Sequence, residues 1–166
     1  FRKLFGENKE NALSLYNAVN HTSYTDPDDL EYTTLEDVIY MKYKNDVSFL
    51  VDKTLSLYEH QSSYNPNMPL RVMGYDGAEY RAQLLNDSEN LYPVVTLVLY
   101  FGHDKPWNGP LSLKERLNIP KEFEPYVNDY KINLFQIAYL THEQVELFQS
   151  DFKVVADYFV QKRENG

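Results

Sequence analysis

The sequence predicts an α/β protein with a mixed central sheet flanked by helices. Three observations lead to this expectation. Apolar residues recur at helical spacing near both ends of the chain, two β-rich runs joined by a tight turn lie at 46–62, and an apolar, β-rich run lies at 92–101. Helices and strands that follow one another in this way typically form a sheet with helices on its faces. We therefore expect a single domain over residues 1–166.

The composition is that of one globular domain. The chain has 166 residues, of which 43% are hydrophobic, and this is enough for one core. The absence of cysteine excludes disulfide scaffolds and thiolate metal sites. The apolar run at 92–101 is about half as long as a membrane span. The chain begins at Phe1 without an export signal, so we expect a cytoplasmic protein that has no membrane partner and is trimmed at its termini.

The N-terminal segment has the pattern of an amphipathic helix. Between Leu4 and Val19, apolar residues recur mostly at three- and four-residue steps. The acidic run at 21–34 contains Pro27, which disfavours a continuous helix, and we interpret this run as a surface loop. Residues 35–43 are interpreted as a strand, with a helix as the alternative.

Two short runs after this segment have the pattern of a β-hairpin. The runs 46–51 and 55–62 are β-rich, and residues 52–53 between them can form a two-residue turn. In that arrangement Val51 pairs with Thr54. The turn lacks glycine, so the signal is weaker than an Asn-Gly pair would give.

A helix and a buried strand are expected after the hairpin. A loop with two prolines leads into the helix, for which Asn65 or Asn67 is the expected cap. The buried strand covers 93–101. A short amphipathic helix with the sequence LSLKERLNI follows, and Pro120 ends it.

The C-terminal part of the chain predicts one more strand and a closing helix. Residues 130–140 are interpreted as the strand, and 141–163 as the helix. Thr141 is the expected N-cap of this helix, while Glu143 and Gln144 suit its first turn. Apolar residues keep helical spacing along it, namely Val145, Phe148, Phe152, Val155 and Phe159.

The hairpin raises the question of why two acids would face each other. With the turn at 52–53, counting outward places Asp46 opposite Glu59, with Gln61 on the same face and His60 pointing away. The β-carbons of opposed residues are about 4.5–5.5 Å apart, so the carboxylates repel unless a cation lies between them. Mg²⁺ fits this separation. From spacing alone, two solvent-facing acids remain the alternative, and a one-residue slip would destroy the site.

The overall charge limits the function classes. A net charge of −9 argues against nucleic acid, because affinity for phosphate comes largely from Lys and Arg. An enzyme that holds a divalent metal between carboxylates nevertheless needs local negative charge, and a basic rim can coexist with an acidic total. The tyrosines are interpreted as half-buried sheet and helix residues rather than as a platform for stacked bases. No zinc-ligand spacing connects the histidines, which are His21, His60, His103 and His142.

Several segments resemble one family. The segment KNDVSFLVDKTLSLYEHQSSYNPNMPLR resembles the core of the PD-(D/E)XK nuclease superfamily, in the branch of Rpn-type recombination-promoting nucleases that are also called putative transposases. LFGENKENALSLYNAVN, YPVVTLVLYFG, DYKINLFQIAYL and SDFKVVADYFVQKR resemble the same group. The resemblance covers most of the chain. It implies a restriction-endonuclease-like core and a DNA endonuclease that depends on Mg²⁺ or Mn²⁺.

The resemblance also implies roles for individual residues. Asp46 and Glu59 match the two acids that bind the metal in that superfamily, and the carbonyl of His60 is a further candidate ligand. Gln61 occupies the position of the lysine that orients or activates the attacking water. Because glutamine brings no positive charge, activation of the water depends more on the metal, and we expect slow or conditional activity.

Two further site residues are weaker candidates. The superfamily often adds an acid from the first helix, and Glu10 is the candidate here, with Glu7 as its substitute. Either could instead be an acid that the helix dipole favours at an N-terminus. Arg71 is a candidate for contact with DNA phosphate, and an ion pair with a surface acid is the alternative.

Two other function classes stay open. The first is a nuclease-like domain that binds DNA or a protein partner without cleavage, which the glutamine at position 61 and the acidic total charge both favour. The second is an interaction domain of a mobile element or defence system. Assembly into a homo-oligomer is open in every case.

Overall fold

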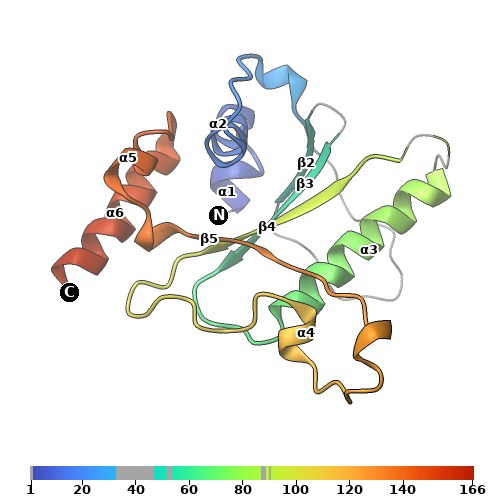
Figure 1. Cartoon of the computed structure of the whole chain (residues 1–166). Coiled ribbons are helices and arrows are strands. Elements are labelled where there is room, and N and C mark those ends of the chain that lie inside the picture. The colour runs from blue at the N-terminus through green and yellow to red at the C-terminus, as the bar shows by residue number, and fades with distance from the viewer. Residues whose placement is uncertain (1, 33–46, 52–53, 87–88, 90) are drawn as a thin grey trace.

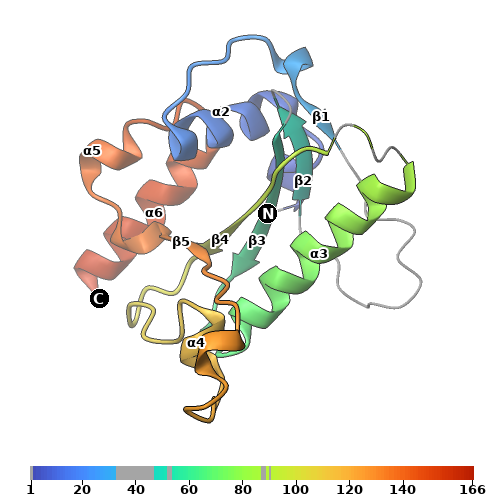
Figure 2. The same cartoon turned by 45° about the vertical axis from the view of Figure 1, so that its right-hand side comes forward.

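The computed structural model describes a central sheet with helices on both of its faces (Figures 1 and 2). The described residues are 2–32, 47–51, 54–86, 89 and 91–166. Within them the sheet has five strands in the order β1-β2-β3-β4-β5. The strands are β1 (Glu31–Tyr32), β2 (Val47–Val51), β3 (Thr54–Gln61), β4 (Val94–Tyr100) and β5 (Asn133–Gln136).

The sheet is mixed, as the sequence predicts. β1 pairs antiparallel with β2, and β2 pairs antiparallel with β3. β3, β4 and β5 run parallel to one another. Parallel neighbours need a crossover connection, and α3 (Met68–Asn86) provides it between β3 and β4. The α/β class is therefore confirmed, whereas the PD-(D/E)XK core stays a prediction.

The hairpin has the predicted register. Val51 pairs with Thr54, and the pairing continues to Val47 opposite Tyr58. Residues 52–53 and the segment 35–43 lie outside the described residues. The register matters for function because a shift by one residue would move every side chain of β3 to the other face.

Helices cover the two faces of the sheet unequally. One face carries α2 (Lys9–Asn20) and α6 (Asp151–Asn165), and the other carries α3 (Figure 2). Shorter helices are α1 (Arg2–Phe5), α4 (Leu113–Arg116) and α5 (His142–Val145), and single 3₁₀ turns occur at Pro27–Asp29, Glu124–Tyr126 and Ile137–Tyr139. Of the helices in the described ranges, none is both long and apolar enough to cross a membrane.

Side-chain alternation along β4 divides the interior into two cores. Leu97 and Leu99 pack into the larger core with residues of α2 and α6. Val98 and Tyr100 point the other way and pack against Met68 and Val72 of α3. A strand covered on both faces reads as a continuous apolar run, which is why the sequence predicts this strand so clearly.

The N-terminal helix predicted over 4–19 is wrong in one respect, because the structure has two helices there. α1 ends at Phe5 and α2 begins at Lys9. Asn8 is the N-cap of α2, and its side-chain oxygen accepts a hydrogen bond from the backbone N–H of Asn11 at 3.0 Å. No apolar side chain lies between Phe5 and Ala12, so the apolar pattern is interrupted at the break, and Asn8 there is a residue type that N-caps favour.

The closing helix predicted over 141–163 is also divided. Thr141 and Gln144 form a capping box at the start of α5, which confirms the predicted cap. α5 ends after one turn, and Ser150 caps α6 by accepting a hydrogen bond from the backbone N–H of Phe152 at 3.3 Å. A second N-cap within an apolar period starts a new helix rather than extending the old one.

Two predicted elements near the end of the sheet are shorter than expected. α4 has four residues, with Ser112 as its cap. β5 covers four of the residues predicted at 130–140. The reason is a competing pairing, because the N–H of Leu113 donates to the carbonyl of Tyr130 and the N–H of Ile132 donates to the carbonyl of Leu111, both at 2.9 Å.

The aromatic centre of the larger core gives a stability prediction. Phe152 is fully buried, and its ring centroid lies 5.0 Å from that of Phe5 and 4.9 Å from that of Phe148. We expect Phe152→Ala to lower the free energy of unfolding by about 3–5 kcal/mol, because it removes transfer energy and leaves a cavity. Urea denaturation followed by circular dichroism measures this change.

Val154 provides the control on the same helix, since its side chain is 71% exposed. Val154→Ala should change the free energy of unfolding by less than about 0.5 kcal/mol. Equal losses for both variants would contradict the assignment of Phe152 to the core.

Candidate active site

Glu59 lies on β3, on the face of the sheet that α3 covers. The residue is 3% exposed. The neighbouring residue Tyr58 belongs to the larger core on the opposite face, and the ring of His60 lies 4.7 Å from the ring of Phe101 in that core. Gln61 shares the face of Glu59, as the predicted alternation requires.

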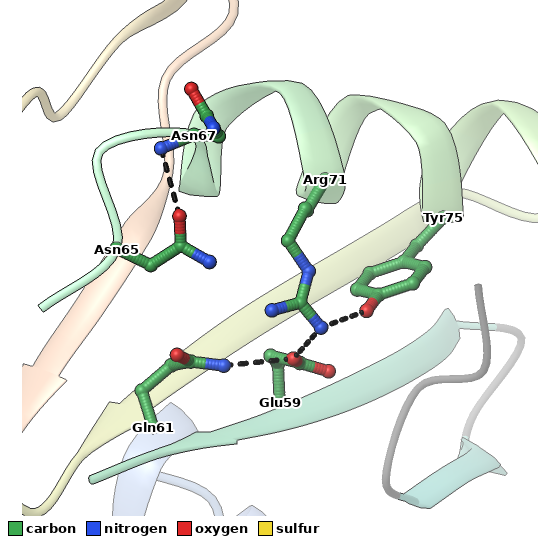
Figure 3. Close-up of polar contacts among 6 residues, drawn as sticks. All are labelled: Glu59, Gln61, Asn65, Asn67, Arg71 and Tyr75. Carbon is green, nitrogen blue, oxygen red and sulfur yellow. Dashed lines mark hydrogen bonds and ion pairs between the residues drawn. The ribbon is translucent and has the colours of Figure 1, made fainter. Parts of the chain in front are cut away.

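Two side chains converge on one oxygen of Glu59 (Figure 3). Gln61 Nε2 donates a hydrogen bond to Glu59 Oε1 at 2.9 Å. Arg71 Nη2 donates to the same oxygen at 2.6 Å and also to the hydroxyl of Tyr75 at 2.8 Å. The guanidinium carbon lies 5.8 Å from the centre of the Tyr75 ring. The result is a polar cluster of Glu59, Gln61, Arg71 and Tyr75 between β3 and α3.

The turn before α3 sets the start of the helix and so the position from which Arg71 contacts the sheet. Asn65 Oδ1 accepts from the N–H of Asn67 at 2.9 Å, and the carbonyl of Asn65 accepts from the N–H of Met68 at 3.2 Å (Figure 3). Of the two predicted caps, Asn65 is thus the one whose side chain bonds the turn. Arg71 and Tyr75 are four residues apart and therefore lie on the same side of α3.

The electrostatics of the cluster follow from burial. A buried carboxylate is costly unless a positive group pairs with it, and Arg71 pairs with Glu59. Burial raises the pKa of the Tyr75 hydroxyl, and the nearby charge of Glu59 raises it further. Tyr75 therefore stays protonated at neutral pH and accepts the hydrogen bond of Arg71 as a neutral group.

A second polar cluster lies next to the first and fixes α3 on the sheet. Asp76 is 4% exposed and accepts hydrogen bonds from the hydroxyls of Thr96 on β4 and Tyr130. Burial raises the pKa of the Asp76 carboxyl although both hydrogen bonds lower it. Burial, followed by the proximity of Asp76, raises the pKa of Tyr130. The cluster ties α3 to β4 and to the segment before β5.

Sequence reasoning missed Tyr75, Asp76 and Glu79. Glu79 is buried too, and burial raises the pKa of its carboxyl. A signal was present, because Val72, Tyr75 and Glu79 are spaced by three and four residues along the helix. Acids that fall on the inward stripe of a helix are candidates for buried polar contacts.

The structure brings some of the predicted site residues together. Glu59, Gln61 and Arg71 meet, and the partner of Arg71 is a buried acid rather than a surface one. Asp46 lies outside the described residues, so its place opposite Glu59 stays a prediction. The described register, which ends one residue later at Val47, is the one that this prediction assumed.

Glu10 and its substitute Glu7 lie elsewhere. Glu10 is in the first turn of α2, on the other face of the sheet. It lines an open groove of about 770 Å³ together with residues 146, 147 and 149. Glu7 lies in the exposed break between α1 and α2. The structure therefore does not place either acid beside Glu59.

The backbone carbonyl of His60 is directed away from β4. The carbonyl of Gln61 accepts from the N–H of Phe101 at 2.8 Å, on the β4 side. Successive carbonyls along a strand point to opposite sides, so the His60 carbonyl points to the side on which β2 lies. This orientation is compatible with the predicted role of that oxygen beside Asp46.

The described ligand atoms suit a hard divalent cation in type but do not complete a site. The Glu59 carboxylate and the side-chain oxygen of Gln61 are the kind of ligand that Mg²⁺ prefers. In the part of the chain that the structure describes, no three His, Cys, Asp or Glu residues gather into a metal-binding group. A metal at Glu59 would need a second acid, and Asp46 is the candidate.

Comparison with known families decides the family of the chain. A family model described as "Putative transposase, YhgA-like" matches residues 32–162, which include β2 to β5 and most of α6. The chain belongs to this family. The match confirms the resemblance to the transposase branch, and the family description points to processing of DNA in mobile elements. No curated protein and no solved structure matches the chain.

The raised pKa of Asp76 predicts a pH dependence of stability. The unfolded chain ionises this carboxyl at its ordinary pKa, whereas the folded chain ionises it at a higher pH. The stability that Asp76 contributes is therefore present below the ordinary value and is lost as the pH rises through the raised one. As the pH rises from about 4 through the raised pKa, Asp76→Asn should gain stability relative to the wild type.

Urea denaturation at a series of pH values measures this trend. Asp29→Asn is the matched control, because Asp29 is exposed. If the difference between wild type and Asp76→Asn stayed constant across the range, the burial of the Asp76 carboxyl would not govern its ionisation.

Proposed function

We propose that the chain is a divalent-metal-dependent DNA endonuclease whose site lies between β3 and α3. The observation that carries the proposal is the buried Glu59 carboxylate, on which Gln61 and Arg71 converge. A buried acid with perturbing partners is a candidate functional group. The family description supports DNA as the substrate.

The position of the cluster in the sheet supports the proposal. Gln61 is the last residue of β3 and pairs with Tyr100, which in turn pairs with Gln136 at the end of β5. The carboxyl ends of the parallel strands therefore meet at one edge. Open α/β sheets typically bind their ligands at this edge.

The metal would be held by Asp46 and Glu59, with the carbonyl of His60 as a further ligand. The register of β2 and β3, which the structure describes up to Val47 and Tyr58, supports this ligand set. The chemistry that a bound Mg²⁺ or Mn²⁺ ion supplies is polarisation of the phosphodiester and a lowered pKa of bound water.

The side chains of the cluster have complementary tasks in this proposal. Gln61 donates to Glu59 through its nitrogen, and its side-chain oxygen is an acceptor that can orient a water molecule. Arg71 carries a positive charge close to where a phosphate would bind. Hydrogen bonds between guanidinium and phosphate are charge-assisted and strong.

The charge distribution on α3 explains how an acidic chain can approach DNA here. The charged residues of this helix are Arg71, Asp76, Glu79 and Arg81. Both acids are buried, while Arg81 is exposed and the side chain of Arg71 is 30% exposed. The accessible charge of α3 is thus positive. Arg116 of α4 lies near the start of α3, where its Nε donates a hydrogen bond to Asn67 Oδ1 at 2.8 Å.

Removal of either proposed metal ligand tests the function. Asp46→Ala and Glu59→Ala should each lower Mg²⁺-dependent cleavage of supercoiled plasmid by about a hundredfold or more, because the transition-state charge loses its stabilisation. Gel electrophoresis of the plasmid measures the rate, and circular dichroism checks that the variants fold.

Glu143→Ala is the matched control, since Glu143 is an exposed acid on α5, far along the chain. It should cleave at the wild-type rate. Wild-type cleavage by a folded Glu59→Ala variant would refute the assignment of the site.

A binding module without cleavage is the second candidate, and the neutral Gln61 beside Glu59 favours it. Calorimetric titration with Mn²⁺ separates the two candidates. The endonuclease should bind the ion and lose this binding in Asp46→Ala. A module that only binds DNA or a protein has no need of a metal site, so DNA binding without Mn²⁺ binding would favour it.

A further inference from the structure

We propose that the protein binds an unpaired base of a DNA strand by stacking it on the ring of Tyr64, at the edge of the proposed site. This inference rests on the proposed function for DNA as the ligand. It deepens that proposal by naming the form of DNA that is bound and the side chain that recognises it. It needs no bound metal, so it can be tested separately from cleavage.

Tyr64 lies in the loop that follows β3, at the edge of the sheet where the proposed site lies. It comes shortly after Gln61, the last residue of β3, and directly before Asn65, whose side chain bonds the turn into α3. Asn65 and Asn67 lie beside the end of β3 that carries Gln61 (Figure 3). A base on Tyr64 would therefore lie at the same edge as the Glu59 cluster.

The ring of Tyr64 is held in place by the loop that follows β4. Its centroid lies 5.3 Å from that of the Trp107 ring, with the two ring planes at 76°. A β-carbon at position 109 would overlap the ring of Tyr64, so the ring lies directly against the backbone of Gly109. Glycine is the residue that permits so close an approach. Packing thus fixes the position of the Tyr64 ring.

Trp107 is itself anchored to the ends of the parallel strands. Its ring centroid lies 5.4 Å from that of Tyr100, the last residue of β4. Its backbone N–H donates a hydrogen bond at 2.7 Å to Oε1 of Gln136, the last residue of β5. The hydroxyl of Tyr100 donates to the carbonyl of Lys105 at 3.0 Å, which ties the loop down a second time. The strand ends therefore support Tyr64 through Trp107.

This row of rings is buried at one end and open at the other. Tyr100 is 5% exposed and Trp107 is 8% exposed, whereas Tyr64 is 43% exposed. A ring that is already fixed loses little conformational entropy when a ligand binds to it. A planar base is a suitable ligand, because every base has a π-face that stacks on an aromatic side chain.

The surroundings of Tyr64 suit the backbone of a DNA strand. Arg116 is exposed, and the hydrogen bond from its Nε to Asn67 Oδ1 holds the guanidinium beside this loop. A guanidinium forms charge-assisted hydrogen bonds with phosphate. Proteins that bind single strands combine stacking rings with positive groups along the backbone in this way. In a duplex the neighbouring pairs cover the face of each base, so stacking on Tyr64 requires an unpaired base.

The experiment compares two oligonucleotides that carry the same number of phosphates. One is a single strand of thymidines about ten nucleotides long, and the other is an abasic strand of equal length. Both are titrated in EDTA, so that no metal-dependent cleavage occurs, and the anisotropy of an end label measures the affinity. The wild type should bind the thymidine strand about tenfold tighter than the abasic strand, because only the thymidine strand has bases to stack.

Substitutions of Tyr64 separate stacking from other contacts. Tyr64→Ala should lose the difference between the two strands. Tyr64→Leu should lose it too, because leucine keeps apolar bulk against Trp107 and Gly109 but has no aromatic face. Tyr64→Phe should keep it, because the ring and not the hydroxyl stacks. Arg116→Gln should weaken the binding of both strands by a similar factor, because phosphate contacts are independent of the base.

Tyr126→Ala is the matched control, since Tyr126 is 82% exposed and lies in the 3₁₀ turn at Glu124–Tyr126. It should bind both strands like the wild type. Circular dichroism checks that every variant folds.

The fluorescence of Trp107 gives a readout that a merely structural role of Tyr64 would not produce. Trp107 is the only tryptophan in the sequence, and its ring contacts that of Tyr64. A base stacked on Tyr64 would lie close enough to change the emission of Trp107. The thymidine strand should therefore quench this emission in the wild type, whereas the abasic strand should leave it nearly unchanged.

The outcomes separate this inference from the proposed function. Equal affinity of the wild type for the two strands would overturn the inference, and this measurement depends on the folding of no variant. A folded Tyr64→Ala or Tyr64→Leu variant that keeps the difference would overturn it as well. Plasmid cleavage in Mg²⁺ is measured separately on the wild type. Cleavage without a preference for bases would refute only the role of Tyr64, and a preference for bases without cleavage would refute only the endonuclease.

Discussion

The ion pair between Glu59 and Arg71 is the constraint on which the arrangement of the site depends. A carboxylate that is 3% exposed is costly unless it is paired or hydrogen-bonded, and Arg71 of α3 pairs with it. The turn at Asn65 sets the start of this helix. The direction of the helix across the parallel strands follows, and with it the position of every inward side chain of α3.

The sheet serves two different purposes on its two faces. On one face Leu97 and Leu99 help to form a core with α2 and α6 that is apolar and rich in aromatic contacts. On the other face Thr96 reaches a buried acid of α3, and Val98 belongs to a smaller core. The larger core stabilises the sheet. The smaller core can therefore accommodate buried polar groups that fix the position of α3 rather than add to the stability of the fold.

The parts of the site that were predictable are those that local geometry determines. Counting from the turn gives the register of β2 and β3, and alternation places Gln61 beside Glu59. The contacts made through folding were not predictable in this way. Asp76 and Tyr130 are 54 residues apart in the sequence. The break at Ser150 was missed because this cap lies between Phe148 and Phe152, which keep helical spacing, whereas the break at Asn8 had a signal in the gap between Phe5 and Ala12.

The proposed action on DNA is compatible with the acidic total charge once the place of each acid is considered. Both acids of α3, Asp76 and Glu79, are buried, so the helix exposes little negative charge at its surface. Of its arginines, Arg81 is exposed and the side chain of Arg71 is 30% exposed. Salt screens charges that are more than about 10 Å apart at ordinary ionic strength. Affinity for phosphate therefore depends on the charges near the binding surface rather than on the total charge. The net charge of −9 therefore opposes DNA binding over the protein as a whole, and exposed arginines such as Arg81 and Arg116 offset it only locally.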